Sequence, residues 1–282
     1  MISYSQGIRP DGRSSLTSFR PVSISPDSIS TAEGSAIVKQ GETIISCGIK
    51  AEIAKPRTET PNEGMCTIIK SGLRSRVIEF AQFLFIPNLI KFLSCNYTFL
   101  YLLGYVVPNL ELSPMCHSQF KPGPPSETAQ VASYFINEVI QNSKIIDLEK
   151  LCIKPGKHVW AIYIDLICLN YDGNILDVSI KALCAALRSA KLPRIEIKDK
   201  SDEEGVIKID ENEEINVDIE NRIAFPINNN IPYCCTIAVF DDDTLLIDPT
   251  EEEEKISHAT VTVVVQVTLI SYIKFWKLDS IA

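Results

Sequence analysis

The chain has 282 residues, enough for one large domain or two small ones, and its 45% hydrophobic residues can form a substantial core. Its formal net charge of −9 argues against a protein that binds nucleic acid without partners, because such proteins usually carry an excess of basic residues that neutralise phosphates. The nine cysteines include no Cys-x-x-Cys pair, and the three histidines complete no zinc pattern. We therefore expect reduced thiols, no metal site and no cofactor.

The N-terminal part predicts a turn followed by a β-hairpin. The stretch "RPDGRS" at 9–14 is rich in turn residues, and Asp11-Gly12 is a strong turn dipeptide. Two apolar runs, "SAIVK" and "TIISCGIKAEI", flank Gln40-Gly41-Glu42 and are expected to pair as antiparallel strands. A loop rich in Pro and Thr, "KPRTETPNEG", follows them.

Two helices and a buried strand are predicted in the middle of the chain. Ser126 is a suitable N-cap for a helix whose apolar residues recur at helical spacing. The run "KHVWAIYIDLICLN" is too continuously apolar for an exposed strand and predicts a central one. In the helix "NILDVSIKALCAALRSA", Asn174 is the expected N-cap, and Asp177 is placed to reach back as in a capping box.

The C-terminal part predicts further strands: "PRIEI", "VIKID", "TIAVF", "TLLID" and "TVTVVVQV". The order of strands, helices and strands again within one domain length favours the α+β class, with helices packed on a mixed, mostly antiparallel sheet.

Four motifs resemble the ribonuclease PH family: "RPDGRS", "GSAIVKQGETIISCGIKAE", "DLICLNYDGNILDVSIKALCAAL" and "TIAVFDDDTLLIDPTEEEE". Within the family, the details resemble a non-catalytic, ribosomal-RNA-processing subunit of the eukaryotic RNA exosome ring. The resemblance implies a ribonuclease PH-like domain (ribosomal protein S5 domain 2-like) at 8–265. It also implies five similar partners in a hexameric ring, S1/KH cap subunits, RNA in a central channel, and a location in the nucleus, nucleolus and cytoplasm.

The phosphate-binding motif of active family members is altered here. In those members, Gly-Thr-Arg-Thr at the start of a helix holds the attacking phosphate. The aligned residues are "GNILD" at 173–177, which put Leu176 at the arginine position and Asp177 at the next hydroxyl position. A carboxylate repels an anion about 4 Å away by roughly 1 kcal/mol in water and by more near a protein surface. The resemblance therefore implies no catalysis, and an active phosphate-dependent 3′-to-5′ exoribonuclease is the alternative.

Other carboxylates leave two interpretations each. Asp248 with Glu253 or Glu254 could hold Mg²⁺, or Asp248 could simply end a strand before solvated glutamates that form a helix start or a loop. We favour the second interpretation. Asp177 is expected to be a helix cap rather than a base. Asp165, within an apolar strand, is expected to be satisfied by backbone amides or a basic neighbour rather than to be a perturbed acid in a cleft.

Basic residues in two loops are the candidate RNA contacts. The resemblance places the regions of Lys55 and Arg57, and of Lys121, on the side that faces the channel. Arg9 and Arg13 are expected either to contact RNA or to lie in a segment that pairs with a neighbouring subunit.

Residues 66–104 are an atypical apolar insertion, because family members run almost directly from the equivalent of "PNEG" to that of "YVVPNLELSP". Phe92–Leu110 carries no charge, so a membrane span is one interpretation. A retained intron or gene-model product is preferred, a lineage-specific surface insertion comes next, and a membrane-associated protein is the least favoured reading. Residues 266–282 are expected to be a divergent, truncated C-terminus.

Overall fold

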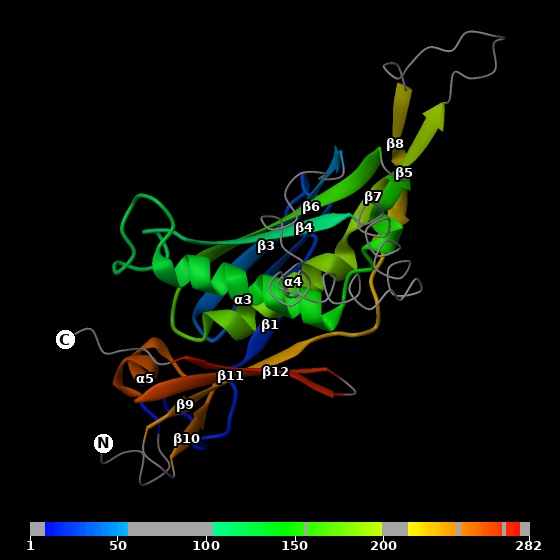
Figure 1. Cartoon of the computed structure of the whole chain (residues 1–282). Coiled ribbons are helices and arrows are strands. Elements are labelled where there is room, and N and C mark those ends of the chain that lie inside the picture. The colour runs from blue at the N-terminus through cyan, green and yellow to red at the C-terminus, as the bar shows by residue number, and fades with distance from the viewer. Residues whose placement is uncertain are drawn as a thin grey trace, which may run out of the picture.

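The computed structural model describes residues 9–55, 104–154, 157–198, 214–240, 244–266 and 269–276. Within these ranges, a large sheet carries two helices on one face, and a smaller sheet lies against the same body (Figure 1). A two-stranded ribbon projects from the opposite end (Figure 1).

The large sheet is mixed. Its strand order is β1 (Val22–Pro26), β2 (Gly34–Gln40), β3 (Thr43–Ala54), β6 (His158–Asn170) and β4 (Tyr105–Leu112), with β5 (Cys152–Lys154) beside the start of β6. Only β4 and β6 run parallel among the described pairs of this sheet. The predicted α+β class, with helices on a mixed and mostly antiparallel sheet, is confirmed.

The predicted hairpin is formed by β2 and β3. Val38 lies opposite Ile45, and Gln40 lies opposite Thr43 across the turn. Alternate residues of β3 point toward the helices, as the period of two in a strand requires, and Ile45, Cys47 and Ile49 are fully buried.

Strand β6 is central, as predicted, because it lies between β3 and β4. Residues 159–162 are buried on both faces, but the later residues alternate between the core and solvent. Asp165 falls on the solvent side of this alternation and is exposed. The interpretation of Asp165 as a perturbed acid in a cleft is therefore wrong, whereas Lys50 on the adjacent strand β3 provides the basic neighbour that the favoured interpretation expects.

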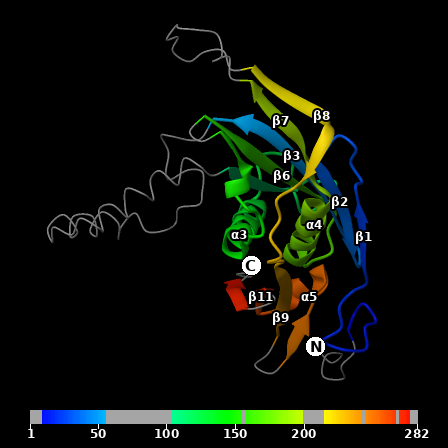
Figure 2. The ribbon, with the colours of Figure 1, turned by 90° about the vertical axis from the view of Figure 1, so that its right-hand side faces the viewer.

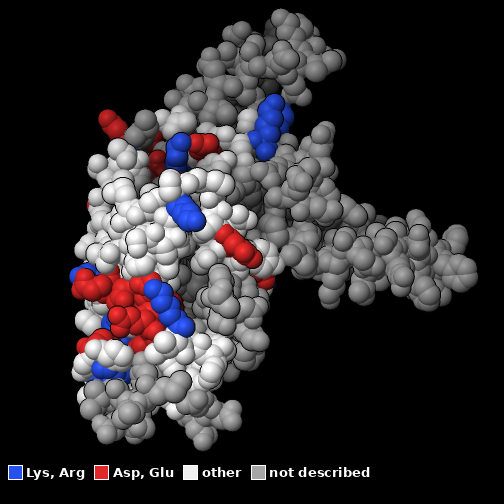
Figure 3. Space-filling model, turned by 90° about the vertical axis from the view of Figure 1, so that its left-hand side faces the viewer, with Lys and Arg blue, Asp and Glu red and all other residues white. Residues whose placement is uncertain are grey.

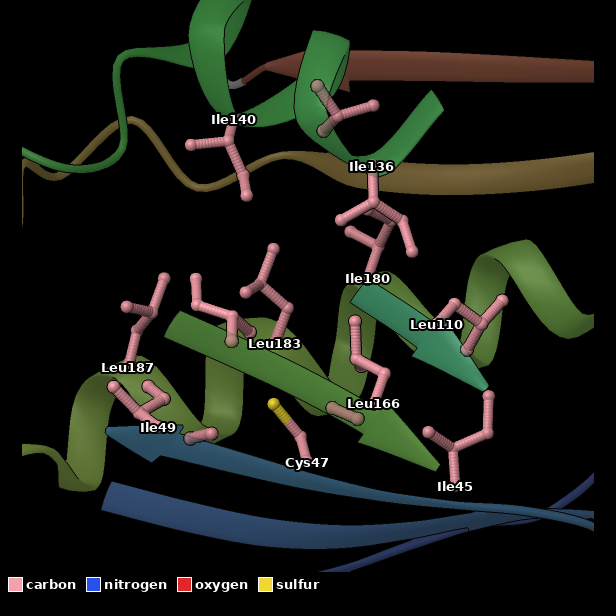
Figure 4. Packing of buried hydrophobic residues seen from close by; sticks show 14 of the residues in the cluster. Ile45, Cys47, Ile49, Leu110, Ile136, Ile140, Leu166, Ile180, Leu183 and Leu187 are labelled. Carbon is pink, nitrogen blue, oxygen red and sulfur yellow. The ribbon is translucent and has the colours of Figure 1, made fainter. Parts of the chain in front are cut away.

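Two helices, α3 (Glu127–Ser143) and α4 (Ile175–Ser189), cover one face of the large sheet. The predicted cap of α3 is confirmed, since Ser126 Oγ accepts a hydrogen bond from the Ala129 N–H at 3.2 Å. Figure 4 shows the packed layer: residues of the sheet face those of both helices (Ile45, Cys47, Ile49, Leu110 and Leu166; Ile136 and Ile140; Ile180, Leu183 and Leu187).

The smaller sheet has the order β10 (Leu245–Ile247), β9 (Tyr233–Val239), β11 (Ala259–Gln266) and β12 (Leu269–Trp276). Helix α5 (Glu251–Ile256) connects β10 to β11. The projecting ribbon pairs β7 (Lys191–Lys198) with β8 (Glu214–Ala224), and a short 3₁₀ turn, η2 (Glu149–Leu151), precedes β5. The predicted strand "VIKID" lies outside the described residues, and residues 214–224 pair with β7.

The apolar stretch at 92–110 is described only at its end. Tyr105–Leu112 forms β4, so the last residues of that stretch belong to the sheet. The predicted insertion at 66–104 lies outside the described residues, apart from Gly104. In the ranges that the structure covers, we find no helix with the length and apolar character needed to cross a membrane.

Candidate functional site: a buried charged junction

Three segments that are distant in sequence meet at one end of the large sheet. They are the N-terminal segment 9–20, the turn 171–177 from β6 into α4, and the segment 248–254 that begins α5. Gly173 lies in this turn with φ +72, and a Cβ there would come within 2.5 Å of the Glu251 nitrogen. The turn is thus packed directly against the start of α5.

The aligned phosphate turn holds no cation. Leu176 is partly buried and packs against the apolar core. Asp177 is fully buried, and its carboxylate accepts hydrogen bonds from Thr236 N at 3.0 Å, Thr236 Oγ1 at 2.8 Å and Asn174 Nδ2 at 3.0 Å. Asp177 therefore fastens α4 to β9. The expectation that it caps its own helix is wrong, because its oxygens bind a strand and a side-chain amide.

Asn174 is the N-cap residue of α4, but its side chain makes no capping bond. Its backbone has φ 51, and its Nδ2 donates to Asp248 Oδ1 at 2.6 Å as well as to Asp177. The predicted side-chain cap is wrong: a cap needs Asn174 Oδ1 as the acceptor, but the two bonds from Nδ2 orient the amide toward the carboxylates, and Oδ1 has no hydrogen-bond partner among the described residues.

Glu254 supplies the negative charge at the start of α4. Its Oε1 accepts from the Asn174 N–H at 2.7 Å, and its Oε2 accepts from the Tyr171 hydroxyl at 3.1 Å. A helix N-terminus favours an anion, and here the chain's own carboxylate takes that position. Burial raises the pKa of Glu254 to about 7, despite the hydrogen bonds from Asn174 and Tyr171.

Asp248 is fully buried, in a left-handed conformation with φ 54. Its carboxylate accepts from the Arg20 backbone N–H at 2.8 Å, from Arg20 Nε at 3.1 Å and from Arg20 Nη2 at 2.9 Å. Burial by itself raises the pKa of Asp248, but the bonds and charge of Arg20 outweigh it and lower that pKa to about 2. Asp248 is thus a buried ion-pair partner rather than a plain strand end.

Glu253 is paired in the same way with Arg9. Arg9 is 1% exposed, and its Nε and Nη2 both donate to the Glu253 carboxylate. Its other bonds reach backbone carbonyls, those of Leu16, Ser18, Ile247 and Asp248. Glu253 also accepts from Thr250 N in a capping box of α5. The glutamates do begin a helix, as predicted, but Glu253 is buried rather than solvated.

The internal bonds of Arg9 and Arg13 argue against the predicted RNA contact. Arg9 is enclosed, and Arg13, which is partly exposed, donates to the carbonyls of Ser18 and Asp248 and pairs with Asp11. Both side chains fasten the N-terminal segment to this molecule, and pairing of that segment with a neighbouring subunit stays a prediction.

The acids do not suit the Mg²⁺ ion of active family members. The oxygens of Asp248 already accept from Arg20 and Asn174, and both oxygens of Glu253 accept from Arg9. Among the described residues, no three His, Cys, Asp or Glu side chains converge as a metal site. The guanidinium groups already occupy most acceptor sites of Asp248 and Glu253 and balance their charge, which weakens both as cation ligands.

The candidate RNA contacts do not form one surface. Lys55 follows β3, whose end lies opposite Val159, whereas Lys121 follows β4, whose end lies opposite Cys168. Nine residues of β6 separate these levels, about 30 Å at 3.3 Å per residue. Both lysines are exposed, and Arg57 lies outside the described residues.

Lys121 lies at the end of the large sheet that carries the charged junction, next to Phe120, which contacts Tyr171. Phe120 stacks edge-on against Tyr171 with ring centroids 5.4 Å apart, and His117 Nε2 lies 3.2 Å from Glu251 Oε2. The loop before α3 therefore covers the turn into α4. The surface on the side of α5 is rich in acidic side chains (Figure 3), which include exposed Glu252 and partly exposed Asp172.

Sequence reasoning missed the residues that complete this junction: Arg20, Tyr171 and Thr236. Arg20 and Tyr171 sit beside turns, and Thr236 lies in the middle of strand β9, so no spacing pattern marks them. Only the folded chain brings them to the carboxylates.

Comparison with known proteins places this geometry in a family. The description "3' exoribonuclease family, domain 1" matches residues 18–78 and 92–193, and "3' exoribonuclease family, domain 2" matches residues 230–269. The first match leaves residues 79–91 uncovered, and the wider insertion predicted at 66–104 stays a prediction, as does the divergent C-terminus.

Curated relatives and solved structures agree with this match. The chain is 38% identical over 258 residues to "Exosome complex component rrp43" of Schizosaccharomyces pombe, covering 92% of this chain and 76% of that protein. It is 33% identical over 260 residues to "Exosome complex component Rrp42" of Saccharolobus solfataricus, covering 92% and 74%.

The fold is similar to that of a chain in the "archaeoglobus fulgidus exosome with RNA bound to the active site", with a TM-score of 0.70 and 25% identity over 98% of this chain and 85% of that chain. Rice Rrp46 is similar in fold alone, with a TM-score of 0.56 and 15% identity over 96% of this chain and 87% of that one. The sequence motifs, the two-part family match and the fold together show that the chain belongs to the 3′ exoribonuclease family of ribonuclease PH-like proteins.

Proposed function

We propose that this protein is a non-catalytic structural subunit of the RNA exosome ring. The observation that carries the proposal is at the start of α4, where Glu254 accepts the Asn174 N–H at 2.7 Å and Leu176 replaces the expected arginine. An attacking phosphate would have to displace a carboxylate from this position and would meet Asp177 and Asp248 behind it.

The chemistry of phosphorolysis explains why this arrangement opposes catalysis. Inorganic phosphate must approach a phosphodiester that is already anionic, so an active site needs uncommitted cations and helix amides. This junction contains cations, but Arg9 and Arg20 are each paired with a buried carboxylate. Freeing either guanidinium would leave an unpaired buried charge.

An active phosphate-dependent exoribonuclease is the second candidate, because three arginines lie at the charged junction: Arg9, Arg13 and Arg20. Their hydrogen bonds to carboxylates and carbonyls of this chain argue against it. A membrane-associated protein is the third and weakest candidate, since Tyr105–Leu112 of the apolar stretch forms a strand within the sheet.

The proposed partners follow from the relatives, which are named as exosome components. We infer that the chain joins other ribonuclease PH-like subunits in a hexameric ring, that S1/KH subunits cap the ring, and that RNA passes through its channel. Its net charge of −9 suits a subunit that contributes a wall and interfaces rather than autonomous RNA affinity. Nucleus, nucleolus and cytoplasm are the proposed locations.

The test is phosphorolysis by the purified full chain, alone and after assembly with its ring partners. A 5′-labelled RNA is incubated with Mg²⁺ and phosphate, and nucleoside diphosphates are measured. We expect no release by the isolated chain, and we expect any activity of the assembled ring to be unchanged by Leu176→Ala. Phosphate-dependent release of nucleoside diphosphates by the isolated chain would overturn the proposal. Loss of the assembled ring's activity after Leu176→Ala would also overturn it.

A further inference from the structure

Strand β1 forms an open edge of the large sheet. It pairs with β2 on one side, and no strand of the described chain pairs with its other side (Figure 2). All five of its residues are exposed. An exposed edge strand presents unpaired N–H and C=O groups that can pair with another chain.

The register shows which backbone groups point outward. The Gly41 N–H donates to the Pro21 carbonyl, and the Asp27 N–H donates to the Ser35 carbonyl, so odd-numbered residues of this segment bond to β2. In an antiparallel pair, the alternate residues direct their N–H and C=O groups away from the partner. The backbones of residues 22 and 24 therefore face outward, while that of residue 26 has only a carbonyl because it is proline.

The side chains of the same two residues form an apolar strip. Val22 lies opposite Gln40, and Ile24 lies opposite Val38, so all four point to the face of the sheet that carries α4. Gln40 and Val38 are fully buried, whereas Val22 and Ile24 are 44% and 51% exposed. The helix thus covers β2 but leaves the apolar face of β1 open.

Basic side chains line the helix side of this strip. Lys181 Nζ lies 2.5 Å from Gln40 Oε1 and 5.9 Å from the centroid of the half-exposed Phe19 ring. Arg188 is seven residues further along α4, which places it two turns away on the same face, and it is exposed. The open edge therefore combines the outward N–H and C=O groups of two residues, two apolar side chains and a positively charged border.

We propose that β1 is a docking strand for an extended segment of a neighbouring ring subunit that carries an acidic residue. The segment pairs with the outward backbone groups of Val22 and Ile24, packs an apolar side chain against theirs, and places its carboxylate near Lys181 or Arg188. The proposal rests on the proposed function, because that function supplies the neighbour. Pro26 limits the added strand to a few residues.

Amide hydrogen exchange on the full chain, followed residue by residue, tests the pairing. In the free chain, the amides of Ser23 and Ser25 should exchange slowly because they bond to β2, while those of Val22 and Ile24 should exchange fast. After assembly with co-purified ribonuclease PH-like subunits, Val22 and Ile24 should slow at least about tenfold.

Each result decides the matter. If the ring assembles and Val22 and Ile24 still exchange fast, the docking proposal is wrong and ring membership stands. If the chain captures no ribonuclease PH-like subunit, the proposed function fails, and the docking proposal fails with it. If the two amides are protected in the isolated chain at high concentration, a second copy is the occupant, which also overturns the proposal.

Matched variants provide an independent measurement. Ile24→Asp should weaken association with the neighbour at least about tenfold, whereas Ser23→Asp, on the opposite face of the same strand, should change it less than about twofold. Arg188→Glu should weaken association and reduce its dependence on salt. All three side chains are exposed, so thermal unfolding of the free variants should match wild type. Unchanged association of Ile24→Asp would contradict the docking strand.

Discussion

Two buried regions of this protein are held together by different physical means. Beneath α3 and α4, apolar side chains such as Ile164, Leu166 and Leu183 are fully removed from solvent. At the charged junction, Arg9, Asp248 and other ionised groups are removed from solvent equally completely. The first region gains free energy from burial itself, whereas the second must compensate the desolvation of each charge with a partner.

The two regions also constrain the sequence to different degrees. The apolar layer needs only side chains of suitable size and spacing, so it constrains the residue types loosely. The junction depends on specific pairs, Arg9 with Glu253 and Arg20 with Asp248, which connect both sheets to the N-terminal segment. The buried acids of the junction thus act as a structural connection between these segments.

The largest expected effect comes from breaking one ion pair of the junction. Arg9→Met should lower the free energy of unfolding by about 4 kcal/mol, because it leaves Glu253 charged, buried and unpaired. Chemical denaturation of the full chain measures this loss. The matched control is Arg9→Met with Glu253→Gln, which removes the unpaired charge and keeps an acceptor for Thr250 N. The double variant should recover more than half of the loss, and an equal loss in both would disprove the assignment.

A cavity in the apolar layer should have the next largest effect. Leu183 is fully buried between the helix and the sheet (Figure 4), and Leu183→Ala should cost about 3 kcal/mol in unfolding free energy. Leu183→Met keeps most of the volume and should cost less than about 1.5 kcal/mol. If the two substitutions cost the same, the site is not tightly packed.

The sequence was a good guide to the apolar layer because strand and helix periods repeat locally. The hairpin at 34–54, the Ser126 cap and the central strand at 158–170 all follow from residues near one another in the chain. The junction could not be predicted in this way. Arg20 meets Asp248 across 228 residues, and the predicted local cap by Asn174 was displaced by carboxylates that only the folded chain brings near.

The charges at the start of α4 and the positions of the candidate RNA contacts were also only partly predictable from the sequence. The resemblance to the family implies Leu176 at the arginine position, but the placement of Glu254 at the start of α4 depends on the position of α5. Similarly, Lys55 and Lys121 share a charge type, and only the strand order shows that they lie at opposite ends of β6.

The third prediction concerns Gly173, where the turn into α4 packs closely against the start of α5. Gly173→Ala should lower unfolding free energy by about 2 kcal/mol or more, because a left-handed residue with a Cβ is strained and this Cβ meets the backbone of residues 249–251. Gly12 has φ +82 with nothing within 4 Å of its Cβ position. Gly12→Ala therefore isolates the conformational strain, about 1 kcal/mol. Equal losses at the two positions would show that the turn does not press on α5.

The smallest expected effect concerns the charge at the start of α4. Because burial raises the pKa of Glu254 from 4.5 to about 7, the folded chain binds more protons than the unfolded chain between those two values. Stability from this group must therefore fall as pH rises through that window. Glu254→Gln cannot titrate and keeps an acceptor for the Asn174 N–H.

The measurement is the difference in unfolding free energy between Glu254→Gln and wild type at pH 5 and at pH 8. It should shift in favour of the variant by about 1 kcal/mol over this range, after allowance for solvent screening of a partly exposed residue. Asp248 does not interfere, since its pKa is lowered to about 2 and its contribution is lost only as pH falls through that value. Asp172, whose pKa burial raises, is present in both proteins and cancels. A difference that stays constant from pH 5 to pH 8 would mean that Glu254 is not held against the helix as an enclosed carboxylate, and the case for a self-occupied anion site would fail with it.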